Sequence, residues 1–534
     1  MTSHKHVACG IFIALFAAYG YFHQGGGWNQ NSRFNQIRAI VENQRFEINE
    51  YFLYQAQASA VGPVKVMRLS APEYLDFNSI PRFANTFDIS VVAGNVYPNK
   101  PPGTVLLALP AYWLIYHTEL LLGVNPDDWW THTFNSYLTT VFSVGLFTAF
   151  GGVVFYFVSR RLFPLLSSWV HVAATLAYAL GTLIFPFGTL LFDHNLVATL
   201  SLCVFGTLLT KNEGGLGYLR ESFAYFLAGV LCGLSIVVNY TAILSSACLL
   251  LYGLRVAKRK LNFAYAGFAG FVAPILLLMS YHAACFGSPF ATANTYQYGM
   301  FRSADTALFG MLMLPSPAVA FEVLFPYYRG LFFTSPVLLL TALGLVLMAN
   351  ERGRRPETCL FASVFAAYLL MNSAFNHWHA GWTIGPRYLI PALPFLALPG
   401  AIMFARLPRL TGALALASCC IMLVATAVDP QVPTGIQNPL YDHVLRLFFG
   451  GRLEVNGLNI EGPVSVNPIG VYENWDLPAD SIRLAERRWH SFNLGEFIWP
   501  GSRWSLVPLI LFITAALVCI GGFLKPEEKS SKVS

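Results

Sequence analysis

The sequence predicts an all-α polytopic membrane protein, and three observations predict it. Of 534 residues, 55% are hydrophobic and only 11% are charged, and the mean hydropathy is +0.53. Soluble globular chains carry roughly 25% charged residues, so this composition excludes a soluble enzyme, a disordered scaffold and a nucleic-acid binder. The net charge of +6 bears on topology, because cytoplasmic loops collect lysine and arginine.

Twelve apolar runs approach the roughly 20 residues that a spanning helix needs. In chain order they are 7–22, 134–158, 168–187, 195–210, 223–238, 240–254, 263–284, 331–349, 358–375, 388–405, 410–428 and 504–523. The first follows Lys5 without a small-residue cleavage site, so we expect a retained signal anchor. Almost nothing polar separates 223–238 from 240–254, so the division between those two runs stays open.

A further run, 103–122, is also apolar enough to span, and the basic residues argue against it. Basic clusters lie at 160–161, 211, 255–260, 352–355, 406–409 and from Lys525 onward. If 103–122 does not span, every cluster shares the side of the N-terminus, which the positive-inside rule makes the cytoplasm. We therefore expect 103–122 to be re-entrant or interfacial and both termini to be cytoplasmic.

This topology divides the chain into three parts. Residues 1–428 form the transmembrane module with its long first outer loop, 23–131; residues 429–503 form a small outer segment that caps the outer face; residues 504–534 form the last helix and a basic tail. A shorter polar segment, about 286–330, also faces outside. The nine cysteines lie in or beside apolar runs and predict neither a disulfide framework nor a zinc site.

The first outer loop contains a helical pattern at 32–42. Its apolar face carries Phe34, Ile37, Ile40 and Val41, and its charged face carries Arg33, Arg38 and Glu42. This pattern is typical of an amphipathic helix on the membrane surface, and a solvated loop helix fits it equally well.

Ionisable residues at the outer helix ends are candidates for chemistry, because charges beside a bilayer are costly unless they are paired or wet. The first group is Asp88 to Gly103, with Tyr97 and Lys100. Pro101 and Pro102 stiffen the chain just before the apolar run, which holds Lys100 where it can meet a lipid phosphate. A lysine that snorkels at a helix start is the alternative.

The second group is Asp193 with His194, in the outer turn before the run 195–210. Asp193 could simply cap the next helix, but a cap does not explain the histidine.

The third and fourth groups contribute arginines. Arg387 ends the stretch 376–387 that also holds His377, His379 and Trp382, and its guanidinium offers a fork for phosphate oxygens. The two histidines suggest a metal, yet no carboxylate is near them in sequence. Trp382 suits an interface anchor or a sugar platform, and Arg329 suits either a snorkelling side chain or a second phosphate contact.

Acids beside basic residues at the outer leaflet fit one kind of chemistry. A carboxylate can act as general base on an acceptor hydroxyl, while lysine or arginine neutralises the charge that develops on a phosphate leaving group. A sugar linked to a lipid phosphate is the substrate class that needs this arrangement.

At these motifs the chain resembles the GT-C superfamily of integral-membrane glycosyltransferases. The nearest branch is similar to the bacterial protein-mannosyltransferase-like and aminoarabinose-transferase-like proteins. The likeness covers most of the chain and rests on SRFNQIRAIVE, GNVYPNKPPG, GTLLFDHN, YRGLFFTSP, GWTIGPRYLIPALPF and SFNLGEF.

The resemblance implies a GT-C-like fold of about 12 transmembrane helices in the bacterial inner membrane, with a long first loop bearing surface helices. It also implies a polyprenyl-phosphate-linked sugar donor, transfer with inversion, and a lipid, glycan or protein acceptor on the extracytoplasmic side. Some relatives use a divalent cation such as Mg²⁺ or Mn²⁺ and others do not, so no metal ligand is assigned.

Site roles follow from the resemblance together with the residue chemistry. Lys100 matches the family lysine that contacts the donor phosphate, and Asp193 matches the acid at the second outer turn. We expect Asp88 and Asp193 as catalytic residues; Lys100, Arg387 and Arg329 at the donor phosphate; and Arg33, Tyr97, His194, His379 and Trp382 at the substrate.

One departure from the family bears on the general base. Relatives often carry an acid shortly before the pair that Arg33 and Phe34 resemble, whereas residues 28–32 here contain none. The base is then Asp88 or Asp193, or activity has been lost. We favour Asp88 because it shares the Lys100 loop.

Two other readings remain. A transporter or lipid-linked-sugar flippase usually shows repeated halves, with broken helices and ionisable residues near the membrane midplane, and this sequence has no visible repeat. A catalytically inactive scaffold is the other, since the family acid is missing.

Overall fold

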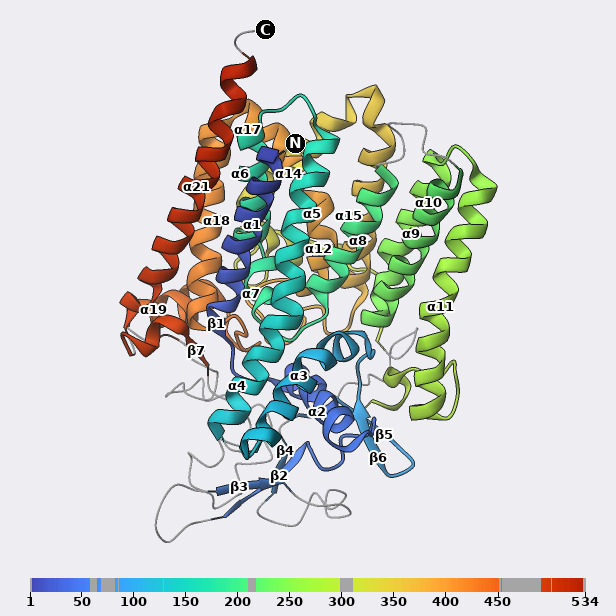
Figure 1. Cartoon of the computed structure of the whole chain (residues 1–534), viewed down its shortest axis with the longest axis vertical. Coiled ribbons are helices and arrows are strands. Elements are labelled where there is room, and N and C mark those ends of the chain that lie inside the picture. Colours follow the sequence, from blue (N-terminus) through green and yellow to red (C-terminus); the bar gives the residue numbers. More distant parts are fainter. Residues whose placement is uncertain are drawn as a thin grey trace.

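The computed structural model of the chain is mostly helical, with long helices side by side and short strands gathered toward one end (Figure 1). It describes residues 2–57, 65–68, 82–84, 86–127, 129–209, 218–297, 311–450, 453, 491–500 and 502–531. The all-α expectation is correct for the bundle, whereas the segments that connect its helices also contain strands.

The bundle begins with α1 (Thr2–Gly20). After the first loop come α4 (Trp129–Thr140), a π-helical turn (Val141–Gly145), α5 (Leu146–Leu162), α6 (Ser168–Leu180), α7 (Ile184–Gly188), α8 (His194–Leu209), α9 (Tyr218–Val238), α10 (Ile243–Val256) and α11 (Lys260–Phe286). The second half contains α12 (Pro317–Leu324), α13 (Leu331–Thr334), α14 (Val337–Ala349), α15 (Arg355–Ala374), the 3-10 turn η8 (Arg387–Ala392), α16 (Leu393–Ala397), α17 (Gly400–Arg406), α18 (Pro408–Val428) and α21 (Val507–Ser531).

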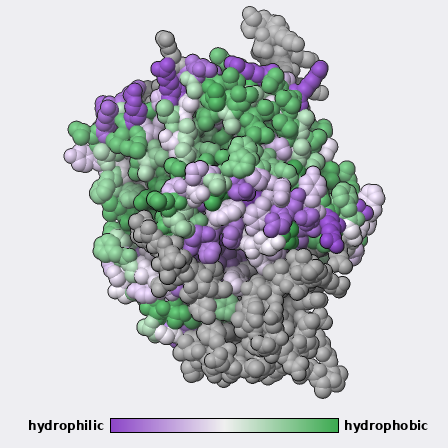
Figure 2. All heavy atoms as spheres, turned by 180° about the vertical axis from the view of Figure 1, so that it is seen from behind, coloured by the Kyte–Doolittle hydropathy of each residue, from purple (hydrophilic) through white to green (hydrophobic). Residues whose placement is uncertain are grey.

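Apolar side chains both fill the bundle and cover its outside. In the interior, Phe361 contacts Phe205 and Phe395, which joins α15 to α8 and α16. On the outside, Phe268 and Val518 remain 69% and 70% exposed. Seen from behind, apolar residues form a broad belt below a hydrophilic rim (Figure 2). Such a surface is stable in lipid rather than in water, so the chain is an integral membrane protein.

The prediction of twelve spans is met only in part. In the part of the chain that the structure describes, seven helices are long and apolar enough to cross a membrane, or eight if a bent pair counts as one span. That pair, Arg387–Ala397 and Gly400–Arg406, is bent by 52°, and the run 168–187 is divided into α6 and α7. Twelve full spans are not seen, because several apolar runs form short or broken helices.

The division at residue 239 is confirmed. Residues 218–256 form two helices, α9 and α10, separated by Asn239 and a 3-10 turn (Tyr240–Ala242). The Asn239 side chain accepts a hydrogen bond from the backbone N–H of Thr241 at 2.9 Å, which begins the turn. Asparagine is well suited to this capping position.

The first and last helices lie side by side. The His6 ring of α1 stacks on Phe523 of α21 with 5.1 Å between ring centroids, and Gly10 faces Ile520. The start of α1 and the end of α21 therefore share one end of the bundle (Figure 1).

The opposite end carries the structured parts of the first loop. These are α2 (Trp28–Asn43), strands β2 (Leu53–Gln57), β3 (Lys65–Arg68), β4 (Arg82–Ala84), β5 (Ile89–Val92) and β6 (Asn95–Pro98), and α3 (Gly103–Leu122). Strands β3, β2 and β4 form one antiparallel sheet in that order, and β5 and β6 form a hairpin.

Helix α3 has the length and apolarity of a span, yet both its ends lie at this end of the bundle. Its first residue, Gly103, is packed against the backbone of Val238, where α9 ends. Near its last turn, Glu119 accepts a hydrogen bond from Asn135 of α4 at 3.1 Å. This placement agrees with an interfacial element rather than a crossing helix.

Helix α2 exists as expected, but the prediction that its charged face meets solvent or headgroups is wrong. Arg33 is 1% exposed and Arg38 is fully buried. The apolar face is as predicted, since Phe34 and Ile37 pack with Val105 and Ala108 of α3. The other face is covered by the turn before α8 and by the loop before α4, which local periodicity could not show.

The described parts of 429–503 pack against the first loop and the loop before η8. Strand β7 (Phe492–Asn493) pairs antiparallel with β1 (Phe22–His23), and the backbone N–H groups of Thr383 and Ile384 donate to the carbonyls of Val432 and Pro430. Residues 454–490 lie outside the described residues, so a cap formed by them stays a prediction.

Candidate functional site

A tight hairpin brings Asp88 and Lys100 together. Ile89 pairs with Pro98 across β5 and β6, so the residues that flank this pair also face each other. Lys100 Nζ lies 3.4 Å from Asp88 Oδ2, and the backbone N–H of Asn99 donates to the Asp88 carbonyl at 3.2 Å. The Asn99 side chain also donates to Asp88 Oδ1, at 3.5 Å.

The turn of this hairpin has a recognisable cause. Ala93 and Gly94, between the two strands, have φ of 50° and 81°. Positive φ at both central residues is the two-residue turn whose twist suits antiparallel strands. The turn therefore sets the register that places the acid opposite the lysine.

A second pair joins α2 to the turn before α8. Arg33 Nη2 lies 2.5 Å from Asp193 Oδ2, and both side chains are at least 95% buried. Arg33 Nη1 donates to the carbonyl and the side-chain oxygen of Asn29, one helical turn earlier. Asn29 thus orients the Arg33 guanidinium.

Arg387 completes the group through a shared aromatic ring. Its Cζ lies 5.2 Å from the centroid of the Phe192 ring, and the Cζ of Arg33 lies 5.8 Å from the same centroid. Two guanidinium groups from distant segments therefore flank one ring, with cation–π attraction to each. The Nε of Arg387 is buried without a hydrogen-bond partner, so this cation retains donor capacity.

The hairpin and α2 are also bonded directly. Thr86 donates its hydroxyl to the Trp28 carbonyl at 2.8 Å and accepts from the backbone N–H of Asp88 at 3.1 Å. Gln30 accepts a hydrogen bond from the backbone N–H of Leu191 at 3.1 Å, which ties α2 to the turn that carries Asp193. The two pairs are thus held by one framework.

Electrostatics shows that the five charges act on one another. Burial lowers the pKa of Lys100; Asp88 and Asp193 oppose this effect, and Arg33 and Arg387 add to it. We call Arg33, Asp88, Lys100, Asp193 and Arg387 the charge cluster. With three cations and two carboxylates it carries a net charge of +1, which favours an anionic ligand.

Asp193 is held in its ionised form. Burial would raise the pKa of its carboxyl, but the attraction of Arg33, then of His194, Lys100 and Arg387, outweighs burial and lowers the pKa below its ordinary value. A carboxylate with a lowered pKa that already accepts from a guanidinium is a weak general base.

His194 contacts the charge cluster from α8. Its Nδ1 lies 3.4 Å from Asp193 Oδ1, and its ring meets Tyr388 edge-on with 6.0 Å between centroids.

Arg329 and His379 lie beside the cluster rather than in it. Arg329 is fully buried, and its Nη2 donates weakly to the carbonyls of Val432 and Pro433, both at 3.4 Å. His379 accepts a hydrogen bond from the backbone N–H of Gly381 at 3.1 Å. Burial, together with the nearby Arg329, His377 and Arg387, lowers the pKa of His379 to about 4.

The other two predicted substrate contacts are placed differently. Tyr97 is 7% exposed and packs in an apolar cluster with Tyr281, Phe286 and Ala293, so the structure does not bring it into the charge cluster. Trp382 is partly exposed in the loop that leads to Arg387.

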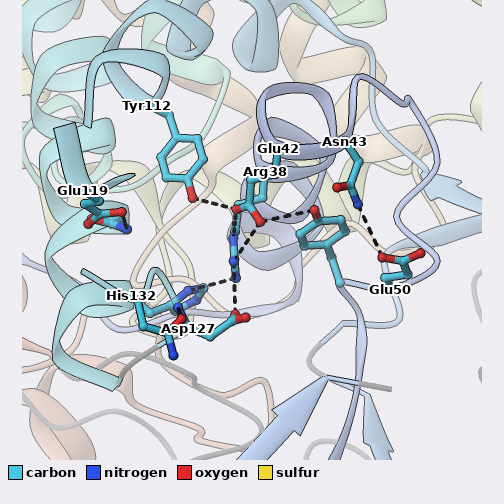
Figure 3. A network of polar contacts seen from close by, with 11 residues as sticks. Arg38, Glu42, Asn43, Glu50, Tyr112, Glu119, Asp127 and His132 are labelled. Atoms are coloured by element: carbon cyan, nitrogen blue, oxygen red, sulfur yellow. Dashed lines mark hydrogen bonds and ion pairs between the residues drawn. The ribbon is translucent and has the colours of Figure 1, made fainter. Parts of the chain in front are cut away.

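A second polar network lies next to α2 and was not expected from the sequence (Figure 3). Arg38 Nε lies 2.6 Å from Glu42 Oε1, and Arg38 Nη2 lies 3.1 Å from Asp127 Oδ1. Arg38 also contacts His132 Nδ1 at 3.2 Å, and Tyr112 of α3 donates to Glu42 at 2.7 Å. This network joins α2 to α3 and α4 and holds the helix that presents Arg33.

The residues of the candidate site that the sequence did not reveal are Phe192, Asn29 and Asn99. Each acts through a contact with a candidate side chain, and none belongs to a residue type that marks a site by itself. No group of three or more histidine, cysteine, aspartate or glutamate side chains suited to a metal ion occurs within the described residues.

Comparison with known proteins gives similarity in structure only. No protein family matches the sequence, and no curated protein matches it. The chain is similar to ArnT from Cupriavidus metallidurans bound to undecaprenyl phosphate, with a TM-score of 0.49 and 13% identity over 97% of this chain and 76% of that one.

It is also similar to the archaeal oligosaccharyltransferase AglB from Archaeoglobus fulgidus in complex with an inhibitory peptide and a dolichol-phosphate, with a TM-score of 0.46 and 11% identity over 89% of this chain and 60% of that one. Both are GT-C membrane glycosyltransferases, the class that the sequence motifs resemble. At these identities and TM-scores, the likeness assigns no activity to the chain.

Proposed function

We propose that this chain is a glycosyltransferase that moves a sugar from a polyprenyl-phosphate donor to an acceptor at the extracytoplasmic face of the membrane, with inversion. The observation that carries the proposal is the charge cluster. Residues from the first loop, the turn before α8 and the start of η8 meet there with a net positive charge, beside a helix whose two ends share that end of the bundle.

The donor phosphate is bound by Lys100 and Arg387. Lys100 ends the hairpin just before α3, where a lipid headgroup and its prenyl chain can approach together. Arg387 has a free Nε, and guanidinium and ammonium groups stabilise the charge that a phosphate gains as it leaves. Arg329 adds positive charge on this side of the site, because it is close enough to Arg387 to interact with it electrostatically.

Asp88 is the general base. Asp193 forms a close ion pair with Arg33 at 2.5 Å and is therefore less available as a base. Asp88 lies 3.4 Å from Lys100, and this contact loosens when Lys100 binds the donor phosphate. Asp193 then positions Arg33 and His194, and the sugar is contacted by Arg33, His194, His379 and Trp382.

The reaction balances without a redox partner. The acceptor oxygen or nitrogen attacks the anomeric carbon of the donor sugar, its proton passes to Asp88, and the bond from that carbon to the phosphate oxygen breaks. The products are the glycosylated acceptor and polyprenyl phosphate, whose charge stays with Lys100 and Arg387. No step requires a metal, although a divalent ion that accompanies the phosphate is compatible with this scheme.

The test uses the full-length protein in detergent with a radiolabelled polyprenyl-phosphate sugar and an extract of envelope acceptors. We expect Asp88→Asn to lose more than about a hundredfold in transfer rate, the range of a lost general base, while it still binds the donor. Lys100→Ala should mainly weaken donor binding. Assays with and without a chelator test for metal use.

Asp442→Asn is the matched control, because Asp442 is an exposed acid far from the cluster in sequence. Full transfer by Asp88→Asn would remove that residue from catalysis. Movement of intact donor across vesicle membranes, without release of polyprenyl phosphate, would instead support the flippase reading. If the protein binds the donor but neither transfers the sugar nor moves the donor across the membrane, it is an inactive scaffold.

A further inference from the structure

A separate cavity of about 520 Å³ lies between α10 and α15. Its lining includes Arg255 in the last turn of α10 and Arg355 at the first residue of α15. These helix ends lie toward the end of the bundle where α1 begins (Figure 1). The charge cluster is at the opposite end, so this cavity is not part of the proposed active site.

The cavity combines two cations with apolar walls. Leu251, Leu360 and Cys359 line it together with the arginines. Leu251 is 67% exposed, so the walls open to the outside of the bundle, where lipid lies. Within the described residues, neither guanidinium makes a hydrogen bond or an ion pair with another side chain.

Glu357, the acid nearest in sequence to Arg355, does not neutralise the two arginines of the cavity. Glu357 is 7% exposed, lies outside the lining, and accepts a hydrogen bond from the Tyr252 hydroxyl at 2.7 Å. The positive potential of two arginines therefore remains at the mouth, next to the positive end of the α15 dipole.

We propose that this cavity binds an anionic phospholipid, with its phosphate between Arg255 and Arg355 and part of one acyl chain along Leu251 and Leu360. The volume lies in the range of sites for small amphiphilic ligands, and basic pockets between helices at the cytoplasmic face suit such headgroups. A free phosphate would leave most of the apolar wall uncovered, so the lipid is the better fit.

Cys359 provides a native reporter, because it lines the cavity and is exposed. The full-length protein in detergent is alkylated with a maleimide, and the rate at each cysteine is read by peptide mass spectrometry. We expect phosphatidylglycerol to slow the labelling of Cys359 and leave Cys519, which is exposed on α21, unchanged. Phosphatidylcholine and inorganic phosphate should protect neither.

Arg255→Gln and Arg355→Gln should each raise the phosphatidylglycerol concentration needed for protection by about fivefold. The control is Arg406→Gln/Arg409→Gln, basic positions at the same end that do not line the cavity, and it should behave as the unmodified chain. Both arginines of the cavity are exposed, so these variants should unfold at the same temperature as the parent.

Three results would overturn the proposal. Equal protection by phosphatidylcholine would mean an apolar groove without headgroup recognition. Protection by inorganic phosphate alone would identify the ligand as free phosphate. Absence of any protection by phosphatidylglycerol would show that no lipid occupies the cavity. None of these results depends on glycosyl transfer, so each is separate from the test of the active site.

Discussion

At the residue scale, the ion pair of Arg33 and Asp193 affects both the stability of the fold and the chemistry of the candidate site. A buried pair of this kind is not strongly stabilising in itself, but removal of one partner leaves an uncompensated buried charge. The chemical types of these residues were readable from the sequence, while their pairing was not, since 160 positions separate them.

We predict that Arg33→Gln and Asp193→Asn each lower the free energy of unfolding by about 3 kcal/mol. The double variant should lose less than the sum, because it buries no unpaired charge. Unfolding in mixed detergent and dodecyl sulfate measures this cycle. Arg45→Gln is the control, since Arg45 is 63% exposed and such contacts contribute about 1 kcal/mol or less. Strict additivity would contradict coupling of the pair.

The lowered pKa of Lys100 predicts a pH dependence. Its ammonium loses the proton at a lower pH in the folded protein than an ordinary lysine, for which the pKa is about 10.4. Donor binding should thus be full at lower pH and fall as the pH rises through the lowered value. Because the unfolded chain binds more protons in that window, stability should rise there with pH.

Lys100→Arg keeps its charge at all accessible pH values and should move the alkaline decline in donor binding to higher pH. Binding titrations of labelled donor between neutral and alkaline pH provide the measurement. Identical profiles for the two proteins would show that Lys100 does not govern binding.

At the scale of elements, the hairpin and the start of α3 place the lysine. The hairpin is local in sequence, but its strands ISVV and NVYP lack strict apolar–polar alternation, so it was not predicted from the sequence. The docking of α3 was also hidden, because it depends on contact between Gly103 and the end of α9, 135 positions later in the chain.

We predict that Gly103→Ala disturbs this docking. A Cβ at residue 103 would lie 2.6 Å from the Cα and N of Val238, so α3 must move away from α9. Stability should fall by about 1–3 kcal/mol, and the donor should bind more weakly because Lys100 is three residues away. The control is Gly521→Ala on α21, where nothing lies within 4 Å of the added Cβ. An unchanged donor affinity would contradict the role of this contact.

At the scale of the whole molecule, the chain termini and the charge cluster lie toward opposite ends of the helix bundle. The start of α1 and the end of α21 share one end. Helix α2, which carries Arg33, and the β5–β6 hairpin, which Asp88 and Lys100 flank, lie toward the other (Figure 1). From the positive-inside rule we predict that the termini lie in the cytoplasm and the charge cluster at the outer face.

We predict that fluorescent proteins fused at either terminus will mature in the cytoplasm. Val91→Cys, on the exposed part of β5, should react with an impermeant maleimide in intact cells, measured in a background that lacks the native exposed cysteines. Lys258→Cys, between α10 and α11, should react only after permeabilisation. The reverse pattern would place the charge cluster in the cytoplasm.

The sequence by itself determined the membrane class, the order of the helices and the residue types of the site, because these follow from local composition and spacing. Only the tertiary structure decided which acid faces which base, that α2 is buried, and that several apolar runs are short or broken helices. Those outcomes depend on contacts between distant segments. A periodic pattern states which face of a helix is apolar, but it does not state what covers the other face.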